Sequence, residues 1–189
     1  SKELRRLSRF FLRAALPHPR RLRFGAHLIR LYQRLGVQKL LRLSHLLYLV
    51  PGGIAKLESQ LPPMGDRFFG PSATVHPAQG SKRMTVALLS GCVMPLAQGP
   101  TMEAAVRVLN RNGCRVVIPK SQFCCGALNL HGGDKSQAQE LARRNIDAFL
   151  EADITAIVVA SAGCGSTMKD YGDLLEGDTT YSELAKRFG

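Results

Sequence analysis

The chain has 189 residues, is 45% hydrophobic and carries a formal net charge of +12 at pH 7, which allows one domain with a real core and an extension. Five cysteines are an odd number and too few for a secreted disulfide scaffold. No signal-peptide pattern is visible, and no apolar run approaches the length of a membrane-spanning helix. We therefore expect a reducing cytoplasm, where clustered cysteines mostly serve metal or redox chemistry.

Positive charge is concentrated at the start of the chain. Residues 1–50 contain twelve Lys and Arg and a single acid, whereas residues 51–189 are nearly neutral. Residues 2–16, 20–35 and 37–49 place apolar residues at helical spacing between arginines, which predicts three basic amphipathic helices. Such helices can pack on a partner domain with solvated basic faces, or bind an anionic membrane surface. Nucleic acid is disfavoured, because no recognisable nucleic-acid module is present.

A segment rich in proline and glycine follows. Residues 51–83 have no sustained hydrophobic period and predict a connecting arm, with one helical turn near residues 54–60. A clear strand comes directly after this arm. The sequence therefore predicts a domain boundary near Lys82 and a separate domain over residues 84–189.

The remainder of the chain alternates between strand and helix patterns. The predicted strands cover residues 85–91, 114–119 and 154–161. The predicted helices cover residues 101–112, 134–152 and 163–175. The order β-α-β-α-β-α predicts an α/β fold with a Rossmann-like parallel sheet and right-handed crossovers.

Four of the five cysteines follow the predicted strands. Cys92 comes after the first strand, Cys124 and Cys125 lie in the loop after the second, and Cys164 lies just past the third. Ligands of such sheets gather at the carboxyl ends of the strands, so the four thiols are expected to meet at one edge. Cys114 opens the second strand at the opposite edge, and is expected to be a small buried apolar residue.

Three kinds of chemistry fit four convergent thiols. Structural zinc suits thiolates, but zinc sites usually use local Cys-x-x-Cys pairs, which are absent here. An iron–sulfur cluster takes thiolates from separated segments, and is favoured. Neighbouring glycines let backbone N–H groups approach the sulfurs, and the helix starting near Gly163 would favour a thiolate at Cys164. The third alternative is a metal-free redox dithiol of Cys124 and Cys125.

The cysteine spacing resembles a known family. There are 31 residues between Cys92 and the Cys124-Cys125-Gly126 motif, and 38 between Cys125 and Cys164. This pattern resembles the cysteine-rich CCG domain of heterodisulfide reductase and its relatives. The segments "GCVMP", "NRNGCRVVIPKSQFCCGALNLHGG" and "SAGCGSTMKDYGDLL" are similar to the iron–sulfur subunit of bacterial glycolate oxidase, and also to the lactate-utilisation iron–sulfur subunit.

The resemblance implies an electron-transfer subunit without catalytic residues of its own. FAD-containing flavoprotein subunits would oxidise a 2-hydroxy acid such as glycolate, and this subunit would pass electrons toward membrane quinone. It would be cytoplasmic, with peripheral contact at the inner face of the membrane. A 4Fe-4S type cluster would be held by Cys92, Cys124, Cys125 and Cys164, with Gly91, Gly126, Gly163, Ser161 and His131 around these ligands. The competing functions are a non-catalytic assembly module of the same complex and a metal-free thiol redox domain.

The sequence departs from the family pattern in three ways. It has one CCG repeat and no Cys-x-x-Cys-x-x-Cys run of a ferredoxin module, so a fragment, a truncated product or a split subunit is expected. Ser161 stands where the pattern has another cysteine, and we interpret it as a helix cap, with weak ligation as the alternative.

Three other polar residues lie near the predicted site. His131 is interpreted as a surface or packing residue, with proton handling or quinone contact as the alternative. Lys120 and Lys169 are interpreted as ordinary solvated lysines, and the alternative is that they lower the pKa of nearby thiols.

Overall fold

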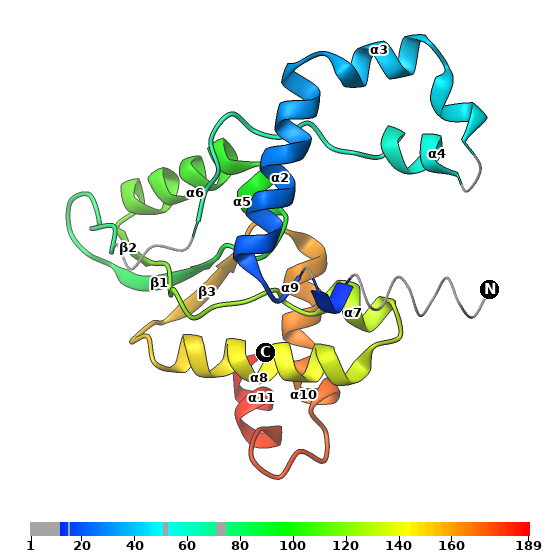
Figure 1. The fold of residues 1–189 in the computed structure, drawn as a ribbon. Coiled ribbons are helices and arrows are strands. Elements are labelled where there is room, and N and C mark those ends of the chain that lie inside the picture. Colours follow the sequence, from blue (N-terminus) through cyan, green and yellow to red (C-terminus); the bar gives the residue numbers. More distant parts are fainter. Residues whose placement is uncertain (1–11, 15, 51–52, 71–74) are drawn as a thin grey trace.

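The centre of the molecule is a small parallel sheet. The computed structural model describes residues 12–14, 16–50, 53–70 and 75–189. The strands are β1 Met84–Leu89, β2 Cys114–Val117 and β3 Ala156–Val159, in the spatial order β2-β1-β3 (Figure 1). Met84 pairs with Cys114, and Val86 pairs with Ala156, both in parallel register. The predicted α/β class with a parallel sheet is confirmed.

Helices connect the strands and follow the last one. They are α5 Met94–Ala97, α6 Gly99–Arg111, α7 Ala127–His131, α8 Lys135–Leu150, α9 Ala162–Lys169, α10 Tyr171–Leu174 and α11 Ser182–Phe188. The helices predicted over residues 101–112 and 134–152 correspond to α6 and α8. The helix predicted over residues 163–175 is divided into α9 and α10, with Asp170 between them. The short helices α5 and α7 were not predicted, because one turn is too short to show a hydrophobic period.

Both faces of β1 are covered. Val86 and Leu88 belong to an apolar cluster that includes residues of α6 and β2. Ala87 and Leu89, which point to the opposite face, belong to a second cluster that includes residues of α8, α9, α10 and α11. Because successive side chains of a strand alternate between its faces, an uninterrupted apolar run is what a central strand needs.

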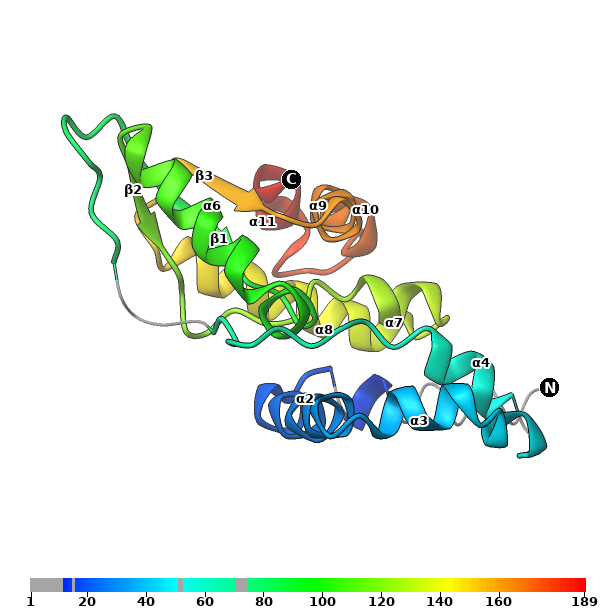
Figure 2. The ribbon, with the colours of Figure 1, turned by 90° about the horizontal axis from the view of Figure 1, so that it is seen from above.

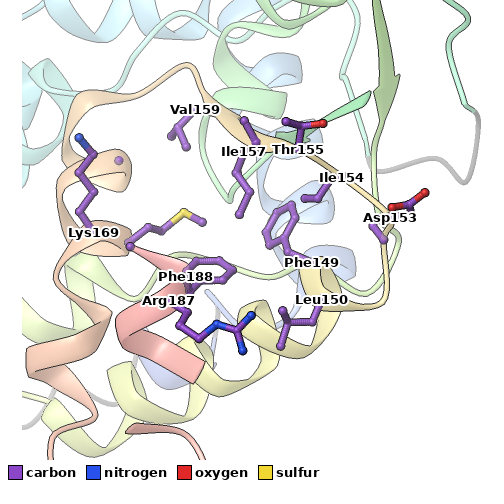
Figure 3. Close-up of a pocket in the computed structure, with 15 residues that line it drawn as sticks. Phe149, Leu150, Asp153, Ile154, Thr155, Ile157, Val159, Lys169, Arg187 and Phe188 are labelled. Carbon is purple, nitrogen blue, oxygen red and sulfur yellow. The ribbon is translucent and has the colours of Figure 1, made fainter. Parts of the chain in front are cut away.

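β3 lies at an open edge of the sheet. Ala156 is exposed and Ile157 is half-buried, although the strand is wholly apolar. A cavity of about 640 Å³ lies beside it, between α8, α9 and α11, with Phe149 and Phe188 in its wall and Arg187 at its side (Figure 3). The lining of this cavity includes no cysteine, so it is separate from the predicted thiol site.

The basic part of the chain forms a group of helices beside the sheet domain. These N-terminal helices are α2 Pro19–Arg34, α3 Val37–Leu43, the 3-10 helix η1 Leu46–Leu49 and α4 Ile54–Ser59. The helix predicted over residues 37–49 ends at Leu43, and the chain turns at His45, whose φ of 55° is left-handed. Most of the helix predicted over residues 2–16 lies outside the described residues, although residues 12–14 are helical. No helix in the described part of the chain is long and apolar enough to cross a membrane.

The segment after α4 attaches these helices to the sheet domain. The N–H of Phe69 donates to the carbonyl oxygen of Pro95 at 2.8 Å, and His76 forms an antiparallel bridge with Val116 at the outer edge of β2. Gly99 is required at the start of α6, because a Cβ there would collide with the carbonyl oxygen of Arg67. The division into residues 1–50, 51–83 and 84–189 stays a prediction.

Candidate metal centre

The four cysteines expected at one edge of the sheet line a single cavity. It has a volume of about 210 Å³ and lies at the carboxyl ends of β1 and β3. Cys92 follows β1, Cys124 and Cys125 lie in the loop between β2 and α7, and Cys164 lies in the first turn of α9. Three connections that are far apart in the sequence therefore bring their thiols to one place, as parallel strands with a common edge do.

The thiols are close together and mostly shielded from solvent. The sulfur atoms of Cys124 and Cys92 are 3.5 Å apart. Cys124 is 3% exposed and Cys125 is 2% exposed, whereas Cys92 and Cys164 are half-buried. Within the described residues, no group of three or more His, Cys, Asp or Glu side chains is arranged to hold a single metal ion.

A buried hydrogen-bond network holds the backbone of the two adjacent cysteines. The amide of Asn145, in α8, donates to the carbonyl oxygen of Cys124 at 3.0 Å and accepts from the N–H of Phe123 at 2.8 Å. The hydroxyl of Tyr171, in α10, donates to the carbonyl oxygen of Cys125 at 2.9 Å. Asn145 also donates to the Tyr171 hydroxyl at 3.2 Å, and both side chains are fully buried. Two helices therefore set the position of this loop.

A second buried amide connects this loop to the end of β1. Gln122 is 4% exposed. Its side-chain oxygen accepts from the N–H of Ser90 at 2.6 Å, and its side-chain nitrogen donates to the carbonyl oxygen of Leu88 at 3.2 Å. Because Cys92 lies two residues beyond Ser90, this contact joins the segments that carry Cys92 and Cys124.

Gly126 has a conformation that other residues rarely adopt. Its φ is +86°, and a Cβ at this position would lie 3.2 Å from the Cα and the carbonyl oxygen of Ala138 in α8. Left-handed backbone and close packing both favour glycine here. Gly91 also has a positive φ, of +67°, but faces open space. Left-handed backbone therefore favours glycine at both positions, and close packing on Ala138 constrains Gly126 further.

Because the four thiols lie close together, they shift one another's pKa values in different directions. The hydrogen bond from Cys124 holds the pKa of the Cys92 thiol below its ordinary value. For Cys124 itself, a hydrogen bond with Cys125 lowers the pKa, but the bond to Cys92 and burial outweigh it and raise the pKa to about 12. The bond to Cys124, together with burial, raises the pKa of Cys125 to about 11. The bond to Cys125 and burial also raise the pKa of Cys164, and both oppose the effect expected from the start of α9.

The raised pKa values of Cys124, Cys125 and Cys164 show that the protein alone opposes four thiolates in this cavity. Each additional negative charge in a small buried volume is opposed by desolvation and by the charges already present. A cationic group in contact with all four sulfurs removes that opposition, and a coordinated thiol is deprotonated outright. The donor set of this cavity therefore suits a group that brings positive charge into it.

The other residues predicted around the ligands have mixed outcomes. Gly91, Gly163 and Ser161 line the cavity. Ser161 occupies the N-cap position of α9, but its side chain makes no capping hydrogen bond, so only the position of the predicted cap is confirmed. His131 lies at the exposed end of α7 and is not part of the cavity lining.

The lysines and the fifth cysteine lie outside the site. Neither Lys120 nor Lys169 lines the thiol cavity, which agrees with their interpretation as solvated lysines. Cys114 opens β2 at the other edge of the sheet and is 8% exposed within an apolar cluster, as predicted. It therefore offers a cysteine that is distant from the cavity but belongs to the same domain.

The N-terminal part of the chain covers one side of the site, which the sequence did not predict. Leu16 is buried in a cluster with Cys124 and Leu141. A second cavity, of about 160 Å³, shares Cys92 and Cys124 with the first, and Arg20 and Arg23 are in its lining. The signal that was available was the apolar spacing of the predicted first helix, but amphipathic spacing does not say what a helix packs against.

Comparison with known protein families agrees with this geometry. Residues 86–169 match the family model described as the cysteine-rich domain, CCG, and residues 3–61 match the model described as the linker region of the glycolate oxidase iron–sulfur subunit. The sheet domain, with its four convergent thiols, is therefore a cysteine-rich domain of the CCG class. No solved structure matches the chain.

Three relatives are similar over different parts of the chain. The "Probable glycolate oxidase iron-sulfur subunit" of Bacillus subtilis (strain 168) is 38% identical over 91% of this chain and 39% of its own length. The "Glycolate oxidase iron-sulfur subunit" of Escherichia coli (strain K12) is 36% identical over 54% of this chain and 26% of its own length. "Lactate utilization protein A" of Geobacillus kaustophilus is 33% identical over 55% of this chain and 43% of its own length.

These matches cover the N-terminal helices and the sheet domain. The chain contains a cysteine-rich CCG domain and a segment similar to the linker region of glycolate oxidase iron–sulfur subunits, and the first relative is similar along nearly the whole chain. The chain spans 39% of the length of that relative.

Proposed function

We propose that this protein is the electron-transfer part of a flavin-dependent 2-hydroxy-acid oxidase or dehydrogenase acting on glycolate. Its partner is a flavoprotein subunit that carries FAD and oxidises the substrate. The electrons then leave toward membrane quinone, and the protein works in the cytoplasm at the inner face of the membrane. This chain supplies no catalytic residue to the oxidation of glycolate. The support comes from the match to the linker model of glycolate oxidase iron–sulfur subunits, from the similarity to the Bacillus subtilis relative and from the thiol cavity.

One observation carries the proposal: four thiols from three strand ends line one small cavity. We assign Cys92, Cys124, Cys125 and Cys164 as ligands of an iron–sulfur cluster of the 4Fe-4S type. Such a cluster supplies a one-electron carrier whose potential depends on its ligands, on hydrogen bonds and on burial. The residues around it have separate tasks. Asn145 and Tyr171 hold the loop of the two adjacent ligands, and Gln122 joins that loop to the segment before Cys92.

The ligand assignment is tested by anaerobic reconstitution of the full chain with iron and sulfide. We expect a brown protein with about four iron and four sulfide per chain at most. Cys125→Ser should lose the colour, and Cys92→Ser, Cys124→Ser and Cys164→Ser should bind less iron and sulfide. Cys114→Ser is the matched control, because it removes a thiol of the same domain at the other edge of the sheet. Unchanged iron and sulfide in all four ligand variants would reject the assignment.

A second candidate function is a metal-free redox dithiol, with Cys92 and Cys124 in place of the expected pair of Cys124 and Cys125, because the sulfurs of Cys92 and Cys124 are 3.5 Å apart. Oxidation would join the two sulfurs in a disulfide and release two protons and two electrons, with a flavin of the partner as the acceptor. Titration of free thiols before and after oxidation by flavin measures this step. A loss of two thiols that disappears in Cys92→Ser, with no iron retained by the wild-type protein, would favour the dithiol over the cluster.

A further inference from the structure

The outer face of α2 carries a stripe of exposed apolar side chains. Phe24 is 66% exposed, Leu28 is 52%, Leu31 is 53% and Leu35 is 68%. Their spacing of three or four residues places them on one face of the helix. The opposite face contains Ala26, which is the buried residue of α2. The helix therefore packs on the molecule through one face and presents a continuous apolar face to the outside.

Apolar side chains are also exposed on α3 and η1, which follow α2 along the chain. Leu40 is 66% exposed, Leu43 is 69%, Tyr48 is 75% and Leu49 is 80%. Single exposed apolar residues are normal on a soluble protein, but this many on consecutive helices mark a surface that binds something apolar. In the view from above, α2 and α3 follow one another along one side of the molecule (Figure 2). We use the name apolar stripe for eight exposed side chains of α2, α3 and η1: Phe24, Leu28, Leu31, Leu35, Leu40, Leu43, Tyr48 and Leu49.

Positive charges border the apolar stripe. With 3.6 residues per turn, Arg20 and Arg21 fall on opposite sides of the α2 part of the stripe, and Lys39 lies in α3 next to Leu40. Among the described residues, neither Arg20 nor Lys39 takes part in an ion pair. The carboxylate of Glu58, in α4, already accepts hydrogen bonds from neighbouring side chains that include Arg42. Arg20 also lines the cavity beside Cys92 and Cys124, so Lys39 is the cation that is available to meet an external anion.

The inner face of α2 is held firmly enough to keep the stripe pointing outward. The guanidinium of Arg30 lies 3.7 Å from the centre of the Phe68 ring. The side chain of Gln33 donates to the carbonyl oxygen of Pro62 at 3.0 Å and accepts from the N–H of Met64 at 2.9 Å. Contacts of this kind anchor α2 to the segment after α4, and through it to the sheet domain.

We infer that the apolar stripe binds the surface of an anionic lipid bilayer. An apolar helical face bordered by arginine and lysine fits the boundary between acyl chains and headgroups, and the cations add attraction to anionic lipid. A protein groove would have to supply acidic residues for the bordering cations, whereas an anionic bilayer supplies both the apolar layer and the negative charge. The inference names the protein surface that faces the membrane of the proposed quinone acceptor, and in this respect it rests on the proposed function. It does not require the cluster, so it can fail or succeed independently of the ligand assignment.

The test is co-sedimentation of the full chain with vesicles. One set contains phosphatidylcholine alone, and the other contains phosphatidylcholine mixed with phosphatidylglycerol. We expect binding to the mixed vesicles, weaker binding to the neutral ones, and loss of the difference at high salt. The double variant Leu28→Glu with Leu31→Glu should bind at least about tenfold less, because each apolar contact is replaced by a repelled charge. Lys39→Gln should reduce binding to the mixed vesicles by about fivefold.

A control matched in charge keeps this test specific. Val108 and Leu150 are 58% and 56% exposed on α6 and α8, so Val108→Glu with Leu150→Glu adds the same charge away from the apolar stripe. We expect this control to bind vesicles nearly as well as the wild type. Equal losses in both double variants, or no vesicle binding by the wild type, would overturn the inference. Sedimentation without vesicles that is abolished by Leu28→Glu with Leu31→Glu would also overturn it, and would identify a second copy of the chain as the occupant.

Discussion

The sheet domain and the N-terminal helices use apolar residues in opposite ways. α8 and α2 each contain sixteen residues and both are amphipathic. α8 buries seven of its residues against the sheet and the last helices, whereas α2 buries Ala26 alone. An amphipathic pattern therefore predicted both helices, but it did not reveal whether the apolar face is covered by the same chain.

Polar contacts differ between the two regions in the same way. In the sheet domain, Asn145 and Tyr171 are fully buried and bind the backbone of the ligand loop. Among the N-terminal helices, the corresponding contacts join exposed or half-buried groups, such as Arg42 with Glu58. Buried polar contacts are costly to break, because the separated groups cannot bind water instead. Exposed contacts are readily replaced by contacts with water.

The largest difference is expected for leucine truncation. Leu141 is fully buried in α8, whereas Leu40 is 66% exposed in α3. Leu141→Ala should lower the free energy of unfolding by about 2–5 kcal/mol, because it removes buried contacts and leaves a cavity. Leu40→Ala should change it by less than about 0.5 kcal/mol. Chemical denaturation measures both values, and a cost for Leu40→Ala similar to that for Leu141→Ala would show that the N-terminal helices have a covered apolar face.

The buried network should be the next most sensitive feature. Asn145→Ala leaves the N–H of Phe123 and the carbonyl oxygen of Cys124 without their partner, which should cost about 2–3 kcal/mol. It should also lower the iron retained after reconstitution, because the loop of the adjacent cysteines loses its support. Gln33→Ala is the matched control, since it removes an amide that bonds two backbone groups near the surface. A stability loss in Asn145→Ala with unchanged iron retention would separate folding from the site.

Two glycines with similar backbone conformations allow a finer comparison. Gly126 has a φ of +86° and closely approaches Ala138, whereas Gly36, between α2 and α3, has a φ of +72° and faces open space. Gly36→Ala should cost about 1 kcal/mol from backbone strain alone. Gly126→Ala should cost about 2–3 kcal/mol, because the collision adds to that strain. Equal losses of unfolding free energy in thermal or chemical denaturation would mean that the backbone of α8 shifts at Ala138 to accommodate the added methyl group.

The parts of the structure that the sequence predicted are those with a repeating or topological signal. β1 followed from an uninterrupted apolar run, α6 and α8 followed from hydrophobic period, and the meeting of the four cysteines followed from the common edge of parallel strands. The supports of the site had no such signal. In the sequence, Asn145 and Gln122 resemble any other polar residue. Their partners, the backbone of Cys124 and Leu88, are brought to them only by tertiary packing. The turn at His45 was missed for a related reason, since a left-handed histidine has no sequence signature as strong as glycine.

Among the contacts that join the two regions is an ion pair between Arg13 and Asp134. The guanidinium of Arg13 binds both carboxylate oxygens of Asp134, at 2.5 and 2.6 Å, and Asp134 also accepts from the N–H of Gln137 at the start of α8. The hydrogen bond from Arg13 lowers the pKa of Asp134 to about 2, against the opposing effect of burial. Because the folded pKa is below the unfolded one, this stabilisation is complete above pH of about 4 and is lost as the pH falls toward about 2.

This ion pair should give the smallest effect of the four. Arg13 is half exposed, so solvent screens the pair and we expect a smaller contribution than the shift alone implies. Asp134→Asn should remove this part of the pH dependence, and the measurement is the difference in unfolding free energy between wild type and variant across that pH range. Since other carboxylates titrate there too, only the difference is informative. A difference that does not change with pH would mean that Arg13 does not hold the N-terminal segment against the site.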